Sequence, residues 1–266
     1  MKTKSPWWLY IVIFIISQLT AASAMLIINR SQLSNVAALH SSMAWTLFAA
    51  NALAIALFLL FRPKSITRAT TARAFSGRGA RRTSLAFLLA LPVIFLVNIV
   101  QEAFFPEIPD LVGEQTMLVI MHNPLGFVTV ALLGPVAEEL LFRGGVQTDL
   151  SRRYSHQGWF VPIAFSALVF ALIHMNPAQM PAAAILGLVL GFAYWWTGSL
   201  VAPILIHVFN NSFACLMAVL NPDDDSFTAF LGGQEPTIVT ALASLFLLVA
   251  ILHFIHKEGL KPVENF

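Results

Sequence analysis

Long apolar runs leave this chain few ways to fold. Eight stretches consist almost entirely of apolar side chains and are joined by short connections. A helix that crosses the hydrocarbon core of a bilayer needs about 20 such residues, and only helices or closed barrels satisfy all backbone hydrogen bonds within lipid. The stretches are residues 7–28, 43–61, 84–100, 127–150, 159–174, 181–196, 200–220 and 237–256. The sequence therefore predicts an all-α, polytopic membrane protein of about eight transmembrane helices.

The composition agrees with a protein that lives in a bilayer. Hydrophobic residues make up 58% of the chain and charged residues only 11%, and the mean hydropathy is +0.78. Soluble proteins carry about a quarter charged residues. Because the short connections leave no room for a soluble domain, we expect residues 1–266 to form a single transmembrane helical domain. The lipid bilayer is its expected surrounding, nucleic acid is not an expected partner, and the sequence carries no signal for an oligomeric state.

The basic residues predict the orientation. When the amino terminus is placed inside, fourteen of the 15 Lys and Arg residues fall on the cytoplasmic side or at cytoplasmic helix ends, and only Arg30 falls outside. Most acidic loop residues fall on the outer side. This positive-inside bias predicts that both termini are cytoplasmic, and we expect an integral protein of a bacterial inner (plasma) membrane.

Two charged loops have plain interpretations that we favour over functional ones. The basic segment 62–82 could bind anionic lipid or a regulator, but a topology determinant on the membrane surface is the simpler interpretation. The run from Asp223 to Asp225 could hold calcium loosely, but a lone acidic triplet is typical of a solvated loop.

The first stretch also resembles a signal peptide. Lys2 and Lys4 precede it, and Ala22-Ser23-Ala24 has the small residues of a cleavage site. The apolar character resumes at residues 25–28 and gives a full-length span. A retained helix is therefore the favoured interpretation, with cleavage as the alternative.

Ionisable and amide side chains interrupt three of the apolar stretches. A charged group at the centre of a membrane helix costs about 2.5 to 3.5 kcal/mol on insertion scales, so such residues normally face an interior cavity and mark a functional site. The three groups lie in residues 127–150, at the end of residues 159–174 and in residues 200–220. They comprise Glu138, Glu139 and Arg143, then His174, then His207 and Asn211.

Helical spacing separates the roles within the first group. Glu139 and Arg143 are four residues apart with the acid first, the favourable order for an ion pair on one helix face. Glu138 is turned about 100° away and is left to face a cavity, and unequal surroundings can keep one carboxylate as a proton acceptor while the other stays structural. Gly134 and Pro135 precede the pair, and the missing proline N–H predicts a kink or a break that lines a wet cavity.

The histidines follow the same four-residue spacing. His174 follows Phe170, and Asn211 follows His207, so each pair shares a helix face. A single histidine in such a place is more commonly a packing residue. Two histidines, an asparagine and two glutamates in the apolar part of one chain weaken that interpretation and favour a shared site.

Missing motifs narrow the chemistry. The sequence has no His-Glu-x-x-His zinc motif and no Gly-x-Ser-x-Gly elbow. The predicted spans hold no aspartate apart from Asp149, where residues 127–150 run into a polar stretch. Ser166, Ser199 and Ser212 are typical helix-packing residues in membranes. Cys215 is the only cysteine, which excludes an internal disulfide and a thiolate-rich metal site, and we expect it to be a small buried residue. A water activated by glutamate remains, with or without a metal.

Three motifs in order resemble the signature of one family. Residues 138–143 read EExxxR, residues 170–174 read FxxxH and residues 207–211 read HxxxN. On successive hydrophobic helices these are similar to the motifs of the CPBP family, the CAAX prenyl endopeptidase and bacteriocin-processing family, also called Abi. The resemblance covers a motif-bearing core at about residues 127–220, and the first three stretches carry none.

The resemblance implies an intramembrane endopeptidase. Glu138 would activate the water, His174 and His207 would complete the site, and Asn211 would help to hold the water or the developing oxyanion. The resemblance leaves the cofactor undecided: a carboxylate and two histidines, namely Glu138, His174 and His207, could bind a divalent metal such as zinc with an open position, or could act as hydrogen-bonding groups. The supporting members would be Glu139 and Arg143.

Other classes of function stay open. A proton-coupled transporter also uses intramembrane Glu, His and Arg, but the first three stretches have no such residues at comparable depth, so the motif-bearing half has no inverted partner. A membrane immunity or scaffold protein would bind a partner without turnover. For an enzyme, the expected substrate is a peptide or a membrane protein, with or without a prenyl group.

A stripe of small residues marks a helix contact rather than a part of the site. Gly187 and Gly191 form a GxxxG pattern that Ala183 and Ala184 extend. Small residues let helix backbones approach where lipid offers no hydrophobic drive between helices. We expect this face to pack against another helix of the same chain.

Overall fold

The computed structural model describes residues 5–30, 36–62, 75, 77–105, 108–109, 114–221 and 226–258. Within these residues the apolar stretches are helical and no strand forms. Seven of the described helical segments are long and apolar enough to cross a membrane, which confirms the all-α membrane fold. They are α1 (Trp7–Ile28), α2 (Val36–Phe61), α4 (Gly77–Phe104), the composite segment Pro124–Arg153, α10 (Met180–Thr197), α11 (Val201–Leu220) and α13 (Gln234–Glu258).

The remaining apolar helix, α9 (Phe160–Leu172), is shorter than predicted. Its 13 residues give about 20 Å of helix, whereas the hydrocarbon core is about 30 Å thick. The apolar run continues to Met175, but the chain already turns at His174 and Met175, whose N–H groups donate to carbonyls three residues earlier. Among the described residues, seven rather than eight segments therefore have the length of a span, and His174 follows the end of α9.

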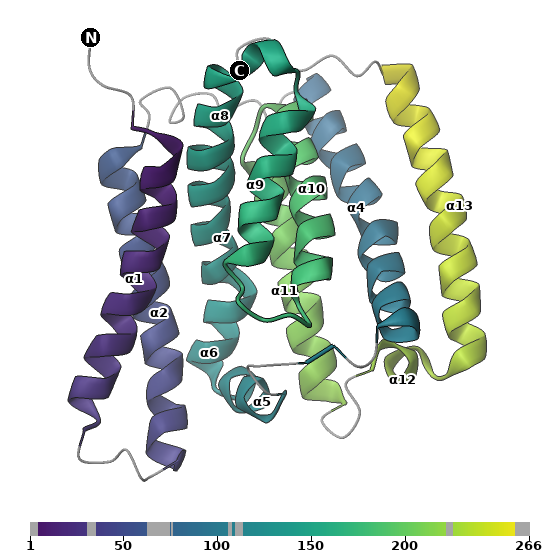
Figure 1. The fold of residues 1–266 in the computed structure, drawn as a ribbon. Helices are drawn as coiled ribbons and strands as arrows, with labels where there is room; N and C mark the ends of the chain where they lie inside the picture. Colours follow the sequence, from purple (N-terminus) through teal and green to yellow (C-terminus); the bar gives the residue numbers. More distant parts are fainter. Residues whose placement is uncertain are drawn as a thin grey trace.

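The helices lie side by side in one bundle (Figure 1). The composite segment and α9, α10 and α11 occupy its middle, with α1 and α2 packed together on one side and α4 and α13 on the other. Short helices occur in the connections: α5 (Glu114–His122), η3 (Ser155–Gln157) and α12 (Phe227–Leu231). α1 begins and α13 ends at the same, upper side of the bundle. The motif-bearing helices thus lie at its centre.

The composite segment is one continuous helix with two wide turns. It consists of α6 (Pro124–Val128), the π-helical η1 (Thr129–Leu133), α7 (Gly134–Glu139), the π-helical η2 (Leu140–Gln147) and α8 (Thr148–Arg153). The N–H of Gly134 donates to the carbonyl of Thr129, five residues earlier. The irregularity expected at Gly134 and Pro135 is therefore a widened turn and not a break. Such π turns are frequent at functional sites.

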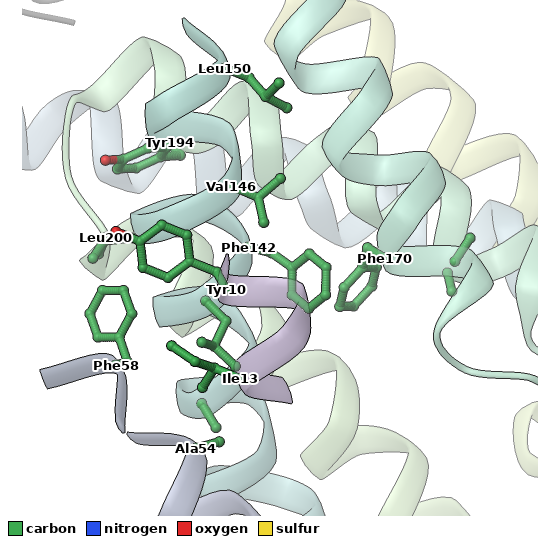
Figure 2. Packing of buried hydrophobic residues seen from close by; sticks show 14 residues of the cluster. Tyr10, Ile13, Ala54, Phe58, Phe142, Val146, Leu150, Phe170, Tyr194 and Leu200 are labelled. Atoms are coloured by element: carbon green, nitrogen blue, oxygen red, sulfur yellow. The ribbon is translucent and has the colours of Figure 1, made fainter. Parts of the chain in front are cut away.

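α1 is anchored to the composite helix. Its first residue, Trp7, donates its N–H to Asp149 Oδ2 at 2.8 Å, and the fully buried ring of Tyr10 packs directly on Gly145. Figure 2 shows Tyr10 and its α1 neighbour Ile13 within a cluster that includes Phe142 of η2. α1 thus supplies buried residues to this cluster, and retention of the first helix stays a prediction.

The GxxxG face of α10 makes the predicted close contact inside the monomer. A Cβ atom at Gly187 would lie 3.0 Å from both Cα and Cβ of Ala167 on α9, and one at Gly191 would lie 2.8 Å from Cγ2 of Ile163. Real Cβ contacts are rarely so short. The glycines are thus required by the distance between α9 and α10.

Several peripheral predictions have simple outcomes. Cys215 is fully buried, as expected. Asp223 to Asp225 lie outside the described residues, and so do residues 63–74 and 76 of the basic segment. Arg82, assigned to that segment, lies instead inside α4, where it is buried and donates through Nη1 to the Trp196 carbonyl at 3.1 Å.

We expect Gly187→Leu to destabilise the protein, because the added side chain must push α9 away from α10. Overpacking of this kind costs about 1 to 3 kcal/mol or more, and thermal unfolding in detergent measures it. Ile185→Leu is the matched control, since Ile185 is on the same helix and 42% exposed. Equal melting temperatures for the two variants would contradict the packing role.

Candidate active site

Glu139 and Arg143 form the predicted ion pair. Arg143 Nη1 donates to Glu139 Oε1 at 2.9 Å, and both side chains are completely buried. The guanidinium of Arg143 also donates through Nη2 to the Gly187 carbonyl at 3.0 Å and lies 4.8 Å from the centroid of the Phe170 ring. Each of these partners offsets part of the cost of burying a charge.

His207 lies between the two adjacent carboxylates. Its Nδ1 is 2.8 Å from Glu139 Oε1, and its Nε2 is 3.7 Å from Glu138 Oε2. The first distance is that of a hydrogen bond and the second is too long for one. The expected approach of His207 to Glu138 is confirmed, but Glu139 is not reserved for Arg143 and instead serves both Arg143 and His207. The Glu138 side chain is 19% exposed while that of Glu139 is 0% exposed, so only Glu138 is accessible to a reactant.

The partners of the two histidines determine which ring nitrogen carries the proton. His207 Nδ1 faces a carboxylate oxygen, and His174 Nδ1 lies 2.8 Å from the Phe170 carbonyl. An ionised carboxylate and a carbonyl accept and do not donate, so Nδ1–H is the donor in both cases. In each neutral imidazole, Nε2 is then the basic nitrogen.

The ring of Phe170 lies against both histidines. The sequence analysis named Phe170 only as the residue four positions before His174 and did not predict it as part of the site. Its ring meets that of His174 at a centroid distance of 4.9 Å and that of His207 at 5.6 Å, both edge-on. The four-residue spacing in FxxxH was the signal, because it places Phe170 and His174 on one face. In the described contacts, His174 touches Phe170, Phe170 touches His207, and His207 contacts the two carboxylates. The direct approach of His174 to Glu138 stays a prediction.

Asn211 binds a backbone carbonyl that the wide turn leaves without a donor. The N–H of Gly134 donates to Thr129, and Pro135 has no N–H, so neither of these residues can donate to Val130. Asn211 Nδ2 donates to the Val130 carbonyl at 3.1 Å, and Asn211 Oδ1 accepts from Asn210 Nδ2 at 3.1 Å. The predicted role for Asn211 at the water or oxyanion is therefore accompanied by a structural role at η1.

The carbonyls of the GxxxG face accept hydrogen bonds from the composite helix. Besides the bond from Arg143 to Gly187, Gln147 Nε2 donates to the Gly191 carbonyl at 2.9 Å. Sequence reasoning missed Gln147, although its position four residues after Arg143 places both on one helix face. The GxxxG face therefore has two roles. It packs α10 closely against α9, as predicted, and its backbone carbonyls accept hydrogen bonds from Arg143 and Gln147.

The three metal-ligand candidates, Glu138, His174 and His207, do not assemble into a metal site. In the part of the chain that the structure describes, no group of three His, Cys, Asp or Glu side chains is placed to hold one ion. The inferred tautomers would suit ligation through Nε2, but a catalytic zinc needs three protein ligands together. A divalent metal at this site therefore stays a prediction.

An apolar cavity of about 190 Å³ lies elsewhere, between α4, α10 and α13. Side chains such as Val97, Ile185 and Leu248 line it, and Gln101 is its polar member. It shares no lining residue with the polar site, so the water-accessible cavity expected at Glu138 stays a prediction.

Comparison with known proteins agrees with this geometry. A family model described as "Type II CAAX prenyl endopeptidase Rce1-like" matches residues 120–213, which hold all three motifs. The motif-bearing part of the chain is thus similar to this CAAX protease family. It is an integral membrane protein by its helices and its relatives.

Two curated relatives of the chain are bacterial. It is 28% identical over 113 residues to the membrane-embedded CAAX protease MroQ of Staphylococcus aureus, a match covering 41% of this chain and 46% of the relative. It is 22% identical over 252 residues to the putative membrane peptidase YdiL of Bacillus subtilis, covering 92% and 100%. The first match thus spans about half the length of the relative. No solved structure matches the chain.

We expect Arg143→Ala to lower both stability and activity. Removing one partner of a buried ion pair costs about 3 to 5 kcal/mol because the other charge is left uncompensated, and Glu139 would then lose one of its two donors. The measurements are the melting temperature and the yield of folded protein.

Arg153→Ala is a matched control for this prediction. Arg153 also follows an acid by four residues in the composite segment, but it is 47% exposed, and exposed pairs contribute little. If Arg143→Ala were inactive but melted like Arg153→Ala, Arg143 would take part in catalysis directly and would not be a structural partner.

Proposed function

We propose that this protein is an intramembrane endopeptidase in which Glu138 activates the attacking water. One observation carries the proposal: His207 Nε2 and Glu138 Oε2 face each other at 3.7 Å, and both are acceptors in the inferred protonation state. Two acceptors this close repel each other unless a shared donor lies to one side of the pair, within hydrogen-bond distance of both. A water whose two O–H groups donate to Nε2 and Oε2 satisfies both and is held with its oxygen lone pairs directed away from them.

The proposed reaction follows from this placement. The water oxygen attacks the carbonyl carbon of the scissile peptide while one water proton passes to Glu138, within the reach that general-base catalysis requires. The tetrahedral intermediate then breaks its C–N bond, and Glu138 returns the proton to the leaving amine nitrogen. The products are a carboxyl group and a free amine, and Glu138 is ionised again.

The other site residues have supporting tasks in the proposal. Glu139 holds His207 Nδ1–H, so the imidazole keeps one tautomer and one orientation, as a buried carboxylate does for a histidine base. Asn211 uses one amide N–H for the Val130 carbonyl, and its second N–H is the donor that we assign to the water or the oxyanion. His174, with Nδ1–H fixed on Phe170, completes the polar wall of the site.

The substrate class follows from the surroundings of the site. All of these residues lie on helices or turns of a membrane bundle, so the proposed substrate is a peptide or a membrane protein that enters from the bilayer. MroQ is named a CAAX protease, and this makes a lipid-modified peptide one substrate to test beside an unmodified one.

We expect Glu138→Gln to lower the rate of peptide cleavage by about 10²- to 10⁴-fold, the usual contribution of a general base. Melting temperature should be nearly unchanged, since the described contact of Glu138 with His207 Nε2 is, at 3.7 Å, too long for a hydrogen bond. The assay uses fluorescence-quenched peptides in detergent, with products identified by mass spectrometry. Glu235→Gln is the control, because Glu235 is exposed at the start of α13. Cleavage within tenfold of wild type would remove Glu138 as the base.

The same variant separates an enzyme from a scaffold. In cells, a scaffold or immunity protein would keep its phenotype with Glu138→Gln, because the fold and surface are preserved, while an enzyme would lose it. A divalent metal such as zinc stays a separate proposal for this site. Metal analysis of the purified protein beside a cleavage assay with and without chelator decides it: a metal enzyme holds about one equivalent and loses activity, and a glutamate-water enzyme keeps activity.

A further inference from the structure

The turn after α9 carries an unusual residue directly beside His174. Met175 has a φ of 50°, in the left-handed region, and is the only described residue other than glycine with a positive φ. Helices commonly end on such a conformation, but the residue there is usually glycine or asparagine, which tolerate it without a steric penalty. Non-glycine residues in this region persist where the surrounding structure enforces them, and they concentrate at functional sites.

The rest of the turn is held firmly while the Met175 side chain projects outward. Asn176 is fully buried, and its carbonyl accepts from the N–H groups of Gln179 and Met180. Gln101 of α4 donates to the Ala178 carbonyl at 2.9 Å. Met175 itself is 79% exposed, the largest exposed fraction among the large apolar side chains described. The strain is therefore not relieved by burial of the side chain.

We propose that Met175 is a specificity-determining residue that contacts an apolar side chain of the substrate next to the scissile peptide bond. The inference rests on the proposed function, because it takes His174 as part of the site. A fixed backbone with an exposed, flexible thioether side chain one residue from His174 offers an apolar surface that adapts to different apolar partners. Lipid contact alone does not account for the left-handed backbone, since exposed leucines on regular helices make that contact throughout the chain.

The first experiment compares cleavage of quenched peptides that carry leucine, alanine or serine on either side of the cleaved bond. Met175→Ala and Met175→Gly should lower kcat/KM for the leucine peptide by about tenfold or more, mainly through KM, and change the serine peptide little, in the range for lost apolar contacts. Met175→Leu should retain wild-type values. Leu172→Ala is the matched control, because Leu172 is the last residue of α9, just before the turn that holds Met175, and is 51% exposed.

Stability separates this role from a structural one. Glycine suits a positive φ, so Met175→Gly should melt at or above the wild-type temperature while its KM rises. Wild-type kcat/KM for Met175→Gly on all peptides would overturn the inference and leave the proposed function standing.

A second experiment needs no turnover. Cys215 is the only cysteine and is fully buried, so Met175→Cys adds a single accessible thiol. The leucine peptide should slow its labelling by a maleimide at least severalfold and the serine peptide less, whereas Leu172→Cys should label at one rate throughout. Equal labelling of Met175→Cys with and without the leucine peptide would overturn the inference. If wild type cleaves no peptide, the proposed function fails, and labelling alone decides whether Met175 contacts peptide.

Discussion

The carboxylate of Glu139 connects three helices around the site, namely the composite helix, α10 and α11. Its Oε1 accepts from Arg143 in the same helix and from His207 of α11, and Arg143 also donates to the Gly187 carbonyl of α10. A carboxylate without donors in a lipid-like interior would be very costly. The positions of α10 and α11 are therefore coupled to one buried charge, and a change in either helix alters the donors available to Glu139.

A second constraint comes from the backbone of the composite helix. The π turn η1 shifts the bond of Gly134 to Thr129, Pro135 offers no N–H, and the Val130 carbonyl is satisfied from α11 by Asn211. Irregular backbone at membrane depth is stable only when other groups complete its hydrogen bonds. α11 is thus tied to the composite helix at two places, by His207 to a side chain and by Asn211 to the main chain.

Local periodicity predicted what lies within one helix. The Glu139–Arg143 pair follows from i,i+4 spacing, the bounds of α1 match the predicted residues, and the GxxxG contact follows from the absence of side chains. Periodicity could not predict two other features. The hydrogen bond from His207 to Glu139 joins residues that are 68 positions apart in sequence. The end of α9 at Leu172 is set by a local turn that the apolar pattern does not reveal, because Ile173 and Met175 are also apolar.

The cost of burying polar groups in this bundle also arranges them for catalysis. Each histidine donates its Nδ1–H to a polar group inside the bundle. The acceptor is the Glu139 carboxylate for His207 and the Phe170 carbonyl for His174. Rotation of either ring would break this hydrogen bond, so both Nε2 atoms keep their directions before a substrate arrives. Groups fixed in advance need no reorganisation when charge develops.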